Sequence, residues 1–243
     1  SNHPYENELP TASDLHDVLL QAKGACGLDG WTAQEARDFA RYFPVAIDEL
    51  RDLWVDTTTG APTAWTNATN NDNNDDDNIY DHIYRVRTVG IPKGSDDVRP
   101  ISVASVFVRA WHKALLQRFP PPPPDQWAGR KGVSVATATA HWLEAPKTCG
   151  AEIDLTKAFD MVNHRVAIRA LSRANINPRV TFLLAMQWRA ERICMTNNTP
   201  SRPLRPSRGI PQGCPISPFV LASVLHPWSA SVQRALPNSC TWA

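Results

Sequence analysis

The sequence predicts an α+β fold, and three observations lead to this prediction. Residues 83–91 alternate apolar and polar side chains in the manner of a strand, while residues 11–24 and 32–54 have the spacing of amphipathic helices. Strands and helices then follow one another without a regular βαβ repeat, which argues against a doubly wound sheet. With 243 residues, of which 42% are hydrophobic, the chain is long enough to bury a sizeable core.

The turns and loops of the first half are predicted from their residue types. Residues 27–30, Gly-Leu-Asp-Gly, are typical of a tight turn between the two helices. Residues 70–78 are all Asn or Asp, so we expect a disordered loop over residues 66–78. The strand at residues 83–91 leads through Pro-Lys-Gly into a second short strand, which predicts a hairpin with basic residues on its arms.

Helices dominate the rest of the chain, and proline marks where several of them stop or start. A helix over about residues 104–119 precedes Pro120–Pro124, which favour a stiff extended connector or, alternatively, a recognition ligand. Ser217-Pro218 predicts the N-cap and first position of a last helix, which would run to about His226, where Pro227 would bend it. Between these points the sequence predicts helices at 132–143, 158–173 and 178–190 and strands at 148–155 and 191–196.

Charge is distributed unevenly along the chain, whose formal net charge is only +1. Residues 1–97 carry seven Lys and Arg against 18 Asp and Glu, a net −11, whereas residues 98–243 carry 18 against six, a net +12. A basic half suits a polyanionic partner, because each neutralised phosphate releases condensed counterions. Arginine-rich helices are also common as solvated surfaces, so charge alone favours nucleic acid without deciding it.

The cysteines and the hydropathy pattern limit the compartment. The five cysteines show no CxxC pairing or other metal-ligand spacing, and no signal-like segment begins the chain, which predicts reduced thiols in an intracellular protein of the nucleus or cytoplasm. No apolar run approaches the roughly 18 residues of a membrane span, so no membrane partner is expected. The chain starts at Ser1 and stops at Ala243 without a polar tail, which we interpret as a fragment of a longer protein of unknown oligomeric state.

Two carboxylates near a predicted strand end raise the question of a metal site. Asp154 lies between Ile153 and Leu155, so in an extended strand its side chain would point to the face opposite theirs. There it could hold Mg²⁺, which needs few protein carboxylates, or it could cap a helix or form an ion pair. Asp160 comes six residues later at a helix start, where capping or first-turn charge is the simpler interpretation.

Five segments together resemble the motifs of reverse transcriptases, in particular those of non-LTR retrotransposons and group II introns. IDLTKAFDMVNH (153–164) resembles the first catalytic motif, and GIPQGCPISP (209–218) resembles the motif that follows it. GIPKGSDDVRPIS (90–102) resembles the fingers segment, GLDGW (27–31) the upstream Gly-x-Asp-Gly element, and QWAGRKGVSVATA (126–138) the Gly-Arg-rich motif. Their order and spacing, over roughly residues 20–230, make the resemblance specific.

The resemblance implies a right-hand polymerase fold, with fingers over residues 1–150, an incomplete palm over residues 151–243 and no thumb. It implies DNA synthesis on an RNA template from a DNA primer and dNTPs, with two Mg²⁺ ions as cofactors, in an intracellular ribonucleoprotein. By motif position, Asp154 would ligate both ions, and the backbone carbonyl of Leu155 would be a further ligand.

The resemblance also assigns residues around the incoming nucleotide. Lys93 and Arg99 match the cations that bind the triphosphate. Phe159 matches the bulky residue whose ring would crowd a ribose 2′-hydroxyl and so favour deoxynucleotides. Gln212 and Gly213 match the pair beside the nucleotide sugar and the template base, where glycine lets the backbone approach closely.

Each of these residues also has a simpler interpretation that the sequence leaves open. Phe159 could anchor a helix in the core. Lys93 and Arg99 could form exposed ion pairs with Asp96 or Asp97, worth under about 1 kcal/mol. The glycines and prolines of residues 209–215 could be plain turn residues.

The sequence departs from the family's pattern in its last part. The third motif, an aromatic residue, any residue and then Asp-Asp, is absent, and no acidic residue follows Gln212. Because that motif supplies the remaining metal carboxylates, the 243-residue chain by itself is not expected to polymerise. Asp96-Asp97 lies inside the fingers segment, which argues against it as a displaced substitute. Val98 and Cys214 stand where an aromatic residue and a serine are frequent.

Two other functions remain open from the sequence. An RNA-directed RNA polymerase would also have two aspartates at about this spacing, but Phe159 and the lack of an Asn within residues 211–225 argue against ribonucleotides. A non-catalytic, maturase-like RNA-binding remnant would keep the basic surface and lose the metal site, and an Asp-Asp motif beyond Ala243 would argue against it. A hydrolase has less support, because neither Gly-x-Ser-x-Gly nor His-Glu-x-x-His occurs.

Overall fold

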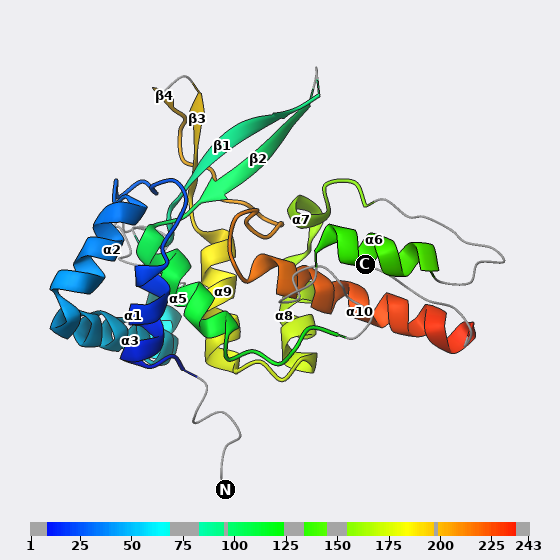
Figure 1. Cartoon of the computed structure of the whole chain (residues 1–243), viewed down its shortest axis with the longest axis horizontal. Helices are drawn as coiled ribbons and strands as arrows, with labels where there is room; N and C mark the ends of the chain where they lie inside the picture. Colours follow the sequence, from blue (N-terminus) through cyan, green and yellow to red (C-terminus); the bar gives the residue numbers. More distant parts are fainter. Residues whose placement is uncertain are drawn as a thin grey trace, which may run out of the picture.

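The computed structural model describes residues 9–68, 83–94, 97–123, 134–144, 155–196 and 199–236. They form a layer of helices and one four-stranded mixed sheet, which projects above the helices in Figure 1. Its helices are α1 (Ala12–Leu20), α2 (Ala33–Tyr42), α3 (Pro44–Ala68), α5 (Val106–Leu116), α6 (Val135–Glu144), α7 (Ala158–Met161), α8 (His164–Arg173), α9 (Pro178–Arg189) and α10 (Ser217–Ala235). Its strands are β1 (Val86–Lys93), β2 (Asp97–Val103), β3 (Arg192–Thr196) and β4 (Thr199–Pro200). The predicted mixture of helices and strands is therefore confirmed.

The sheet has the order β2-β1-β3-β4. Strands β1 and β2 form the predicted hairpin, antiparallel from Arg87 opposite Val103 to Lys93 opposite Asp97. Strand β3, predicted at residues 191–196, pairs with β1 in parallel and with β4 antiparallel. The sheet thus joins strands that lie about a hundred residues apart in sequence. The strand predicted at 148–155 lies outside the described residues except for its last residue.

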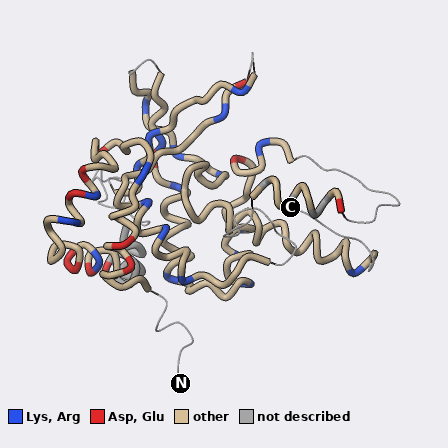
Figure 2. The backbone as a smooth tube through the Cα atoms, viewed as in Figure 1, with Lys and Arg blue, Asp and Glu red and all other residues tan. Residues whose placement is uncertain are grey.

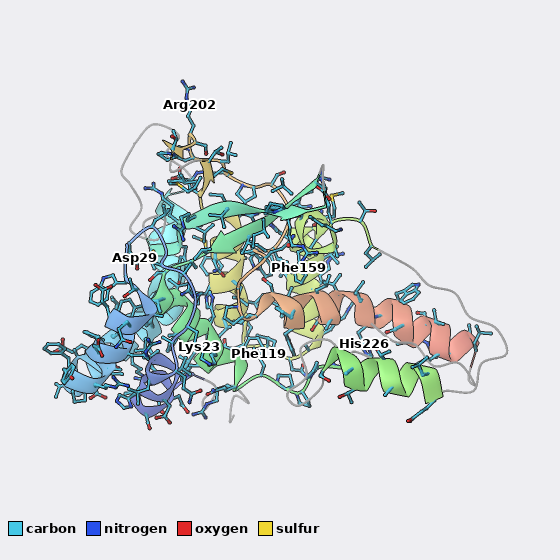
Figure 3. All side chains as sticks on the ribbon, turned by 45° about the horizontal axis from the view of Figure 1, so that its top comes forward. Lys23, Asp29, Phe119, Phe159, Arg202 and His226 are labelled. Carbon is cyan, nitrogen blue, oxygen red and sulfur yellow. The ribbon has the colours of Figure 1, made fainter. Side chains whose placement is uncertain are left out.

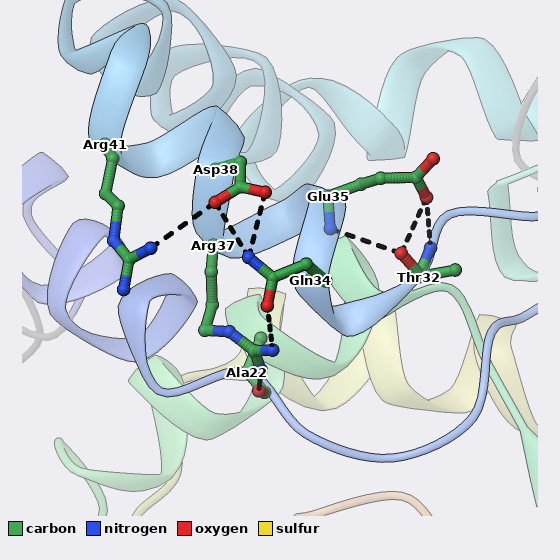
Figure 4. Close-up of polar contacts among 7 residues, drawn as sticks. All are labelled: Ala22, Thr32, Gln34, Glu35, Arg37, Asp38 and Arg41. Carbon is green, nitrogen blue, oxygen red and sulfur yellow. Dashed lines mark hydrogen bonds and ion pairs between the residues drawn. The ribbon is translucent and has the colours of Figure 1, made fainter.

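The N-terminal helices pack together and against α5, as the left part of Figure 1 shows. Helix α2 begins with a capping box, in which the Thr32 hydroxyl accepts from the Glu35 N–H at 3.2 Å and the Glu35 carboxylate accepts from the Thr32 N–H at 2.8 Å (Figure 4). The single helix predicted over residues 32–54 is wrong, because Pro44 lacks an N–H and starts α3 as a separate helix.

Large aromatic side chains fill the interior between the bundle and the sheet. Trp111 of α5 is fully buried and stacks on Trp54 of α3, with ring centroids 6.1 Å apart. Trp54 also contacts Tyr84, just before β1, at 6.1 Å. Because these rings come from three separate segments, they fix the position of the hairpin on the helices.

The acidic residues gather on the N-terminal bundle, as the left side of Figure 2 shows. Red segments gather on helices α1 to α3, with a few more at the hairpin turn, near α7 and at the end of α6, whereas blue segments are spread over the whole chain. The acidic excess of the first part of the sequence is therefore concentrated in one region of the structure, the N-terminal helices.

Several predicted boundaries shift. The helix predicted over 158–173 is divided into α7 and α8, because Asn163 caps α8 through its side chain. The predicted loop at 66–78 begins in the last turn of α3, which extends to Ala68, and residues 69–78 lie outside the described residues. The prolines at 120–123 lie outside any helix or strand, as expected, and Pro124 is not described.

The last helix differs from its prediction at both ends. Its N-cap is Ile216 rather than Ser217, which forms the first helical position and makes no side-chain cap. The helix also continues through Pro227 to Ala235. Proline removes one backbone hydrogen bond, while the hydroxyls of Ser229 and Ser231 donate to the carbonyls of His226 and Pro227 at 2.9 and 2.7 Å.

In the part of the chain that the structure describes, we find no helix with the length and hydropathy to cross a bilayer.

Candidate active site

The β1–β2 hairpin presents both predicted cations on one face. Cross-strand partners in an antiparallel pair share a face, and side chains alternate along each strand. Lys93 is paired with Asp97, and Arg99 with Ile91, so the two cations share a face with Ile101. Both cations are exposed, and neither forms an ion pair with a carboxylate that the structure describes, Asp97 included.

The segment 209–213, which we call the PQG loop, lies between this hairpin and α7 (Figure 1). On the hairpin side, the N–H of Ser102 donates to the carbonyl of Gln212 at 2.7 Å. Gly213 has a φ of +114°, and a methyl group there would overlap the Ser102 carbonyl and lie 3.6 Å from Ile101 Cγ2. Because Ile101 shares a face with Arg99, the PQG loop reaches the face that carries the two cations.

On its other side the PQG loop is bonded to α7. The N–H of Ile210 donates to the carbonyl of Phe159 at 2.9 Å. Gly209, with a φ of +89°, lies so close to α7 that a Cβ would be 2.7 Å from the Asp160 carbonyl oxygen. The side-chain amide of Gln212 donates to Asp160 Oδ2 at 3.1 Å. The loop therefore holds Gln212 between β2 and α7.

Two basic side chains lie at the Gly209 carbonyl. His164 Nε2 is 2.9 Å from this oxygen and an Arg192 guanidinium nitrogen is 3.5 Å from it. Since a carbonyl only accepts, His164 carries its proton on Nε2. Burial lowers the pKa of His164, although the bond to Gly209 opposes this shift. Burial also lowers the pKa of Arg192, and the neighbouring Asp160 carboxylate opposes it.

Cys214 anchors the end of the PQG loop in the core. Its Sγ lies 3.5 Å from His112 Nδ1 on α5 and 3.8 Å from Gln187 Oε1 on α9. Burial raises the pKa of the Cys214 thiol, so it stays protonated near neutral pH. Burial lowers the pKa of His112 to about 3, so this imidazole is neutral as well. Neutral polar groups on two helices thus hold the loop in place.

Comparison with known protein families identifies the family that shares these segments. The family described as "Reverse transcriptase (RNA-dependent DNA polymerase)" matches residues 91–242, which is more than half of the chain. The chain belongs to the reverse transcriptase family. The matched range contains the hairpin turn, β2, α7 and the PQG loop, whereas the first residues of β1 precede it.

Individual relatives of this reverse transcriptase chain come from transposable elements. The "Retrovirus-related Pol polyprotein from type-1 retrotransposable element R2" of Nasonia vitripennis is 29% identical over 234 residues, which cover 81% of this chain and 22% of the relative. The R2 polyprotein of Popillia japonica is 26% identical over 222 residues, covering 79% and 31%. The chain thus spans less than a third of the length of either R2 relative.

A third relative matches a shorter part of the reverse transcriptase chain. The "Transposon TX1 uncharacterized 149 kDa protein" of Xenopus laevis is 32% identical over 85 residues, which cover 35% of this chain and 6% of the relative. Together these similarities support a reverse transcriptase domain of the non-LTR retrotransposon type.

The structure brings several predicted site residues of the reverse transcriptase chain together. Gln212 and Gly213 lie between β2 and α7, and Phe159 lies on α7 beside them (Figure 3). Phe159 also packs in part against the core, as its simpler interpretation predicted. Arg99 lies two positions from Ile101 on the same face of the hairpin, while Lys93 lies nearer the hairpin turn.

The structure describes Asp160 but not Asp154, the carboxylate predicted to bind the metal ions. The predicted capping role of Asp160 is wrong, because the N-cap of α7 is Lys157 and no side chain caps it. Its predicted first-turn position is confirmed. Asp154 lies outside the described residues. Leu155 follows it directly and is 46% exposed, at the start of the segment that enters α7.

A carboxylate followed by a free backbone carbonyl provides the oxygen ligands that Mg²⁺ prefers. Within the described ranges, no three His, Cys, Asp or Glu side chains are close enough to hold a metal ion. Asp160, the nearest described carboxylate in sequence, faces Gln212 instead. Asp154 and the Leu155 carbonyl are the oxygen donors that the resemblance assigns to Mg²⁺, and this assignment stays a prediction because only the exposed Leu155 of the pair is described.

Sequence reasoning missed the groups that hold the PQG loop. His164, Arg192 and His112 contact residues 17 to 102 positions away, and hydrophobic periodicity gives no signal for such pairs. Arg192 had one local signal, a charged residue opening an otherwise apolar strand. Cys214 was noticed only as a departure from serine.

Acidification should destabilise the 243-residue chain through His112. Its pKa is 6.5 in the unfolded state and about 3 when folded, so the unfolded state binds more protons as the pH falls below 6.5. From pH 7 to pH 5 this difference removes about 2 kcal/mol from the free energy of unfolding. Urea unfolding at pH 7 and at pH 5 measures this loss in the wild type and in His112→Gln. The free energy of unfolding of His112→Gln should fall by about 2 kcal/mol less than that of the wild type. His16→Gln is the control, and an equal loss in His112→Gln would contradict the pKa assignment.

Proposed function

We propose that, in the intact protein, this chain forms the nucleotide-binding part of a polymerase that copies RNA into DNA. The observation that carries the proposal is the position of the PQG loop, which is bonded to β2 on one side and to α7 on the other. Three segments that are far apart in sequence, and that each resemble a separate motif, therefore converge on Gln212 and Gly213. The family membership and the R2 relatives support the same activity.

In this proposal, residues 1–150 form the fingers with the N-terminal helices, and residues 151–243 belong to the palm. The sheet takes β1 and β2 from the first part and β3 and β4 from the second. Its partners are an RNA template, a DNA primer and dNTPs, in an intracellular ribonucleoprotein of the nucleus or cytoplasm. The basic residues of the sheet and of the C-terminal helices are suited to binding the nucleic acid. The acidic residues gather on helices α1 to α3, at the left of Figure 2.

The nucleotide would lie against the exposed hairpin face and the PQG loop. Arg99 offers the triphosphate a bidentate fork, and Lys93 offers a point charge nearer the hairpin turn. Gly213 allows the sugar or the template base to approach the backbone, because it has no side chain. Phe159 would lie beside the sugar, where a ribose 2′-hydroxyl would collide with its ring.

The catalytic carboxylate of the proposal is Asp154, with the Leu155 carbonyl beside it. These two groups would hold Mg²⁺, which when bound lowers the barrier to in-line attack of the primer 3′-hydroxyl on the α-phosphate. The chain's own contribution is to orient the nucleotide through the hairpin and the PQG loop, so that the reacting atoms are aligned.

Primer extension by the intact protein tests this function. A DNA primer annealed to an RNA template should be extended with dNTPs in the presence of Mg²⁺, and chelation of the metal should stop extension. Extension with rNTPs alone, or binding of the duplex without extension under any metal condition, would reject the proposal. The first of these outcomes would favour an RNA polymerase, and the second an RNA-binding remnant.

Replacing Phe159 by alanine should relax sugar selection in the intact protein. Loss of the ring opens space for a 2′-hydroxyl, so the ratio of kcat/KM for dNTP over rNTP should fall roughly tenfold or more. Phe119→Ala is the matched control, because Phe119 is also partly buried but lies away from α7 (Figure 3). If the ratio is unchanged in Phe159→Ala, the Phe159 ring does not select the sugar and serves only to pack against the core.

A further inference from the structure

The pair formed by Asp160 and Gln212 is a contact that the motif roles do not explain. Gln212 Nε2 donates to Asp160 Oδ2 at 3.1 Å across 52 residues of sequence, in a partly buried position. Asp160 does not cap α7, and its carboxylate interacts electrostatically with the Arg192 guanidinium. Its carboxylate is therefore directed at the PQG loop rather than at its own helix.

This contact determines which way the Gln212 amide faces. A carboxylate oxygen can only accept a hydrogen bond, so the amide must turn Nε2 toward Asp160. Oε1 then points away from Asp160, and no described residue donates to it. The backbone of Gln212 is also fixed, since its carbonyl accepts from the Ser102 N–H at 2.7 Å. Gln212 thus presents one acceptor atom in one orientation.

The free acceptor lies beside the groups assigned to the nucleotide. Gly213 follows Gln212 directly, and a Cβ added to it would lie 3.6 Å from Ile101 Cγ2, on a residue that shares a face with Arg99. Arg99 and Ile101 are two positions apart along β2, a span of about 7 Å, so the PQG loop meets β2 close to the cation assigned to the triphosphate.

We propose that Asp160 is a positioning residue for nucleotide binding, which holds Gln212 so that its Oε1 accepts a hydrogen bond from a hydroxyl or amino group of the incoming dNTP. The proposal rests on the function proposed above. It predicts that Asp160 matters for the affinity of the nucleotide and not for the chemical step, because Asp160 itself touches neither the nucleotide nor the metal.

An exchange of the two polar groups tests this proposal in the intact protein, with single-dNTP incorporation on an RNA template as the assay. Asp160→Asn has nearly the same shape but lets the Gln212 amide take either orientation, so KM for the dNTP should rise roughly five- to tenfold with kcat little changed. Gln212→Glu sets two carboxylates against each other and should raise KM at least as much. In the double variant Asp160→Asn/Gln212→Glu, the asparagine amide can donate to the glutamate, which still presents an oxygen to the nucleotide. KM should then return to within about threefold of wild type.

A second glutamine–aspartate pair supplies the control. Gln34 Nε2 on α2 donates to both oxygens of Asp38 at 2.8 and 2.9 Å, on the exposed N-terminal bundle (Figure 4). Asp38→Asn removes the same kind of charge there and should leave KM unchanged. The thermal unfolding midpoints of Asp160→Asn and Asp38→Asn should shift by similar small amounts.

The outcomes separate this inference from the proposed function. If the two single effects multiply in the double variant, Asp160 and Gln212 act independently and the inference is wrong, although extension by wild type would leave the polymerase function standing. An effect of Asp160→Asn confined to kcat or to thermal stability would also overturn it. If wild type adds no nucleotide at all, the proposed function fails and the inference fails with it.

Discussion

Replacing Asp154 by alanine should abolish Mg²⁺-dependent primer extension by the intact protein while leaving its affinity for the primer–template nearly unchanged. In the proposed site this carboxylate holds both metal ions, and stabilisation by a metal is worth several kcal/mol in the transition state. Each 1.36 kcal/mol corresponds to a factor of ten in rate. The extension rate should therefore fall roughly a thousandfold or more, as measured by single-turnover assays on an RNA template.

The Asp154 experiment has a neighbouring control. Thr156 lies two positions further along and is exposed, and Thr156→Ala should extend the primer normally. The duplex affinity is measured separately by titration, because phosphate contacts by basic residues do not depend on Asp154. Normal extension by Asp154→Ala would refute the assignment of the first catalytic motif, and loss of duplex binding would mean that the variant is misfolded.

Replacing Gly213 by alanine should damage both nucleotide binding and stability. The residue has a φ of +114°, and its added methyl group would overlap the carbonyl oxygen of Ser102. A non-glycine residue in such a conformation costs about 1–3 kcal/mol, before the overlap is counted. Because the overlap is with backbone, the PQG loop or β2 has to move. We expect the dNTP KM to rise at least roughly tenfold and the thermal midpoint to fall.

Gly30→Ala is the control that distinguishes the effect of backbone strain from that of the steric overlap with Ser102. Gly30 has a φ of +77°, but no atom lies within 4 Å of the position of an added Cβ. This control should therefore lose only about 1 kcal/mol of stability and keep the dNTP KM of wild type. Equal effects of the two substitutions on KM would show that the contact between the PQG loop and β2 has no part in nucleotide binding.

The sequence predicted those elements whose signals are local. The turn at Pro-Lys-Gly predicted the hairpin, and the helix predicted over 178–190 is observed as α9. Predictions failed where tertiary packing overrode a local signal. Pro227 lies inside α10 because the helix is buried on one side, with Ser229 fully buried, and one missing backbone bond does not end it.

The candidate site shows the same limit. Its motif residues could be found in the sequence, because each lies in a short pattern with a known role in the family. The contacts that place them could not, since Gln212 bonds Asp160 across 52 residues and Cys214 meets His112 across 102. For Asp160 the sequence predicted capping or first-turn charge, and the structure confirms the first-turn position. Its partner Gln212 in the PQG loop could not be predicted, because no local signal connects the two residues.

The central claim is that β2, α7 and the PQG loop form one nucleotide site. Photo-crosslinking with a base-modified azido-dNTP, bound to the intact protein with its RNA template and primer, tests this claim most directly. Mass spectrometry of the crosslinked peptides should place the adducts within residues 97–103, 155–162 and 209–216. Excess unlabelled dNTP should suppress these adducts. Specific, competable adducts confined to the acidic bundle of α1 to α3 would contradict the claim.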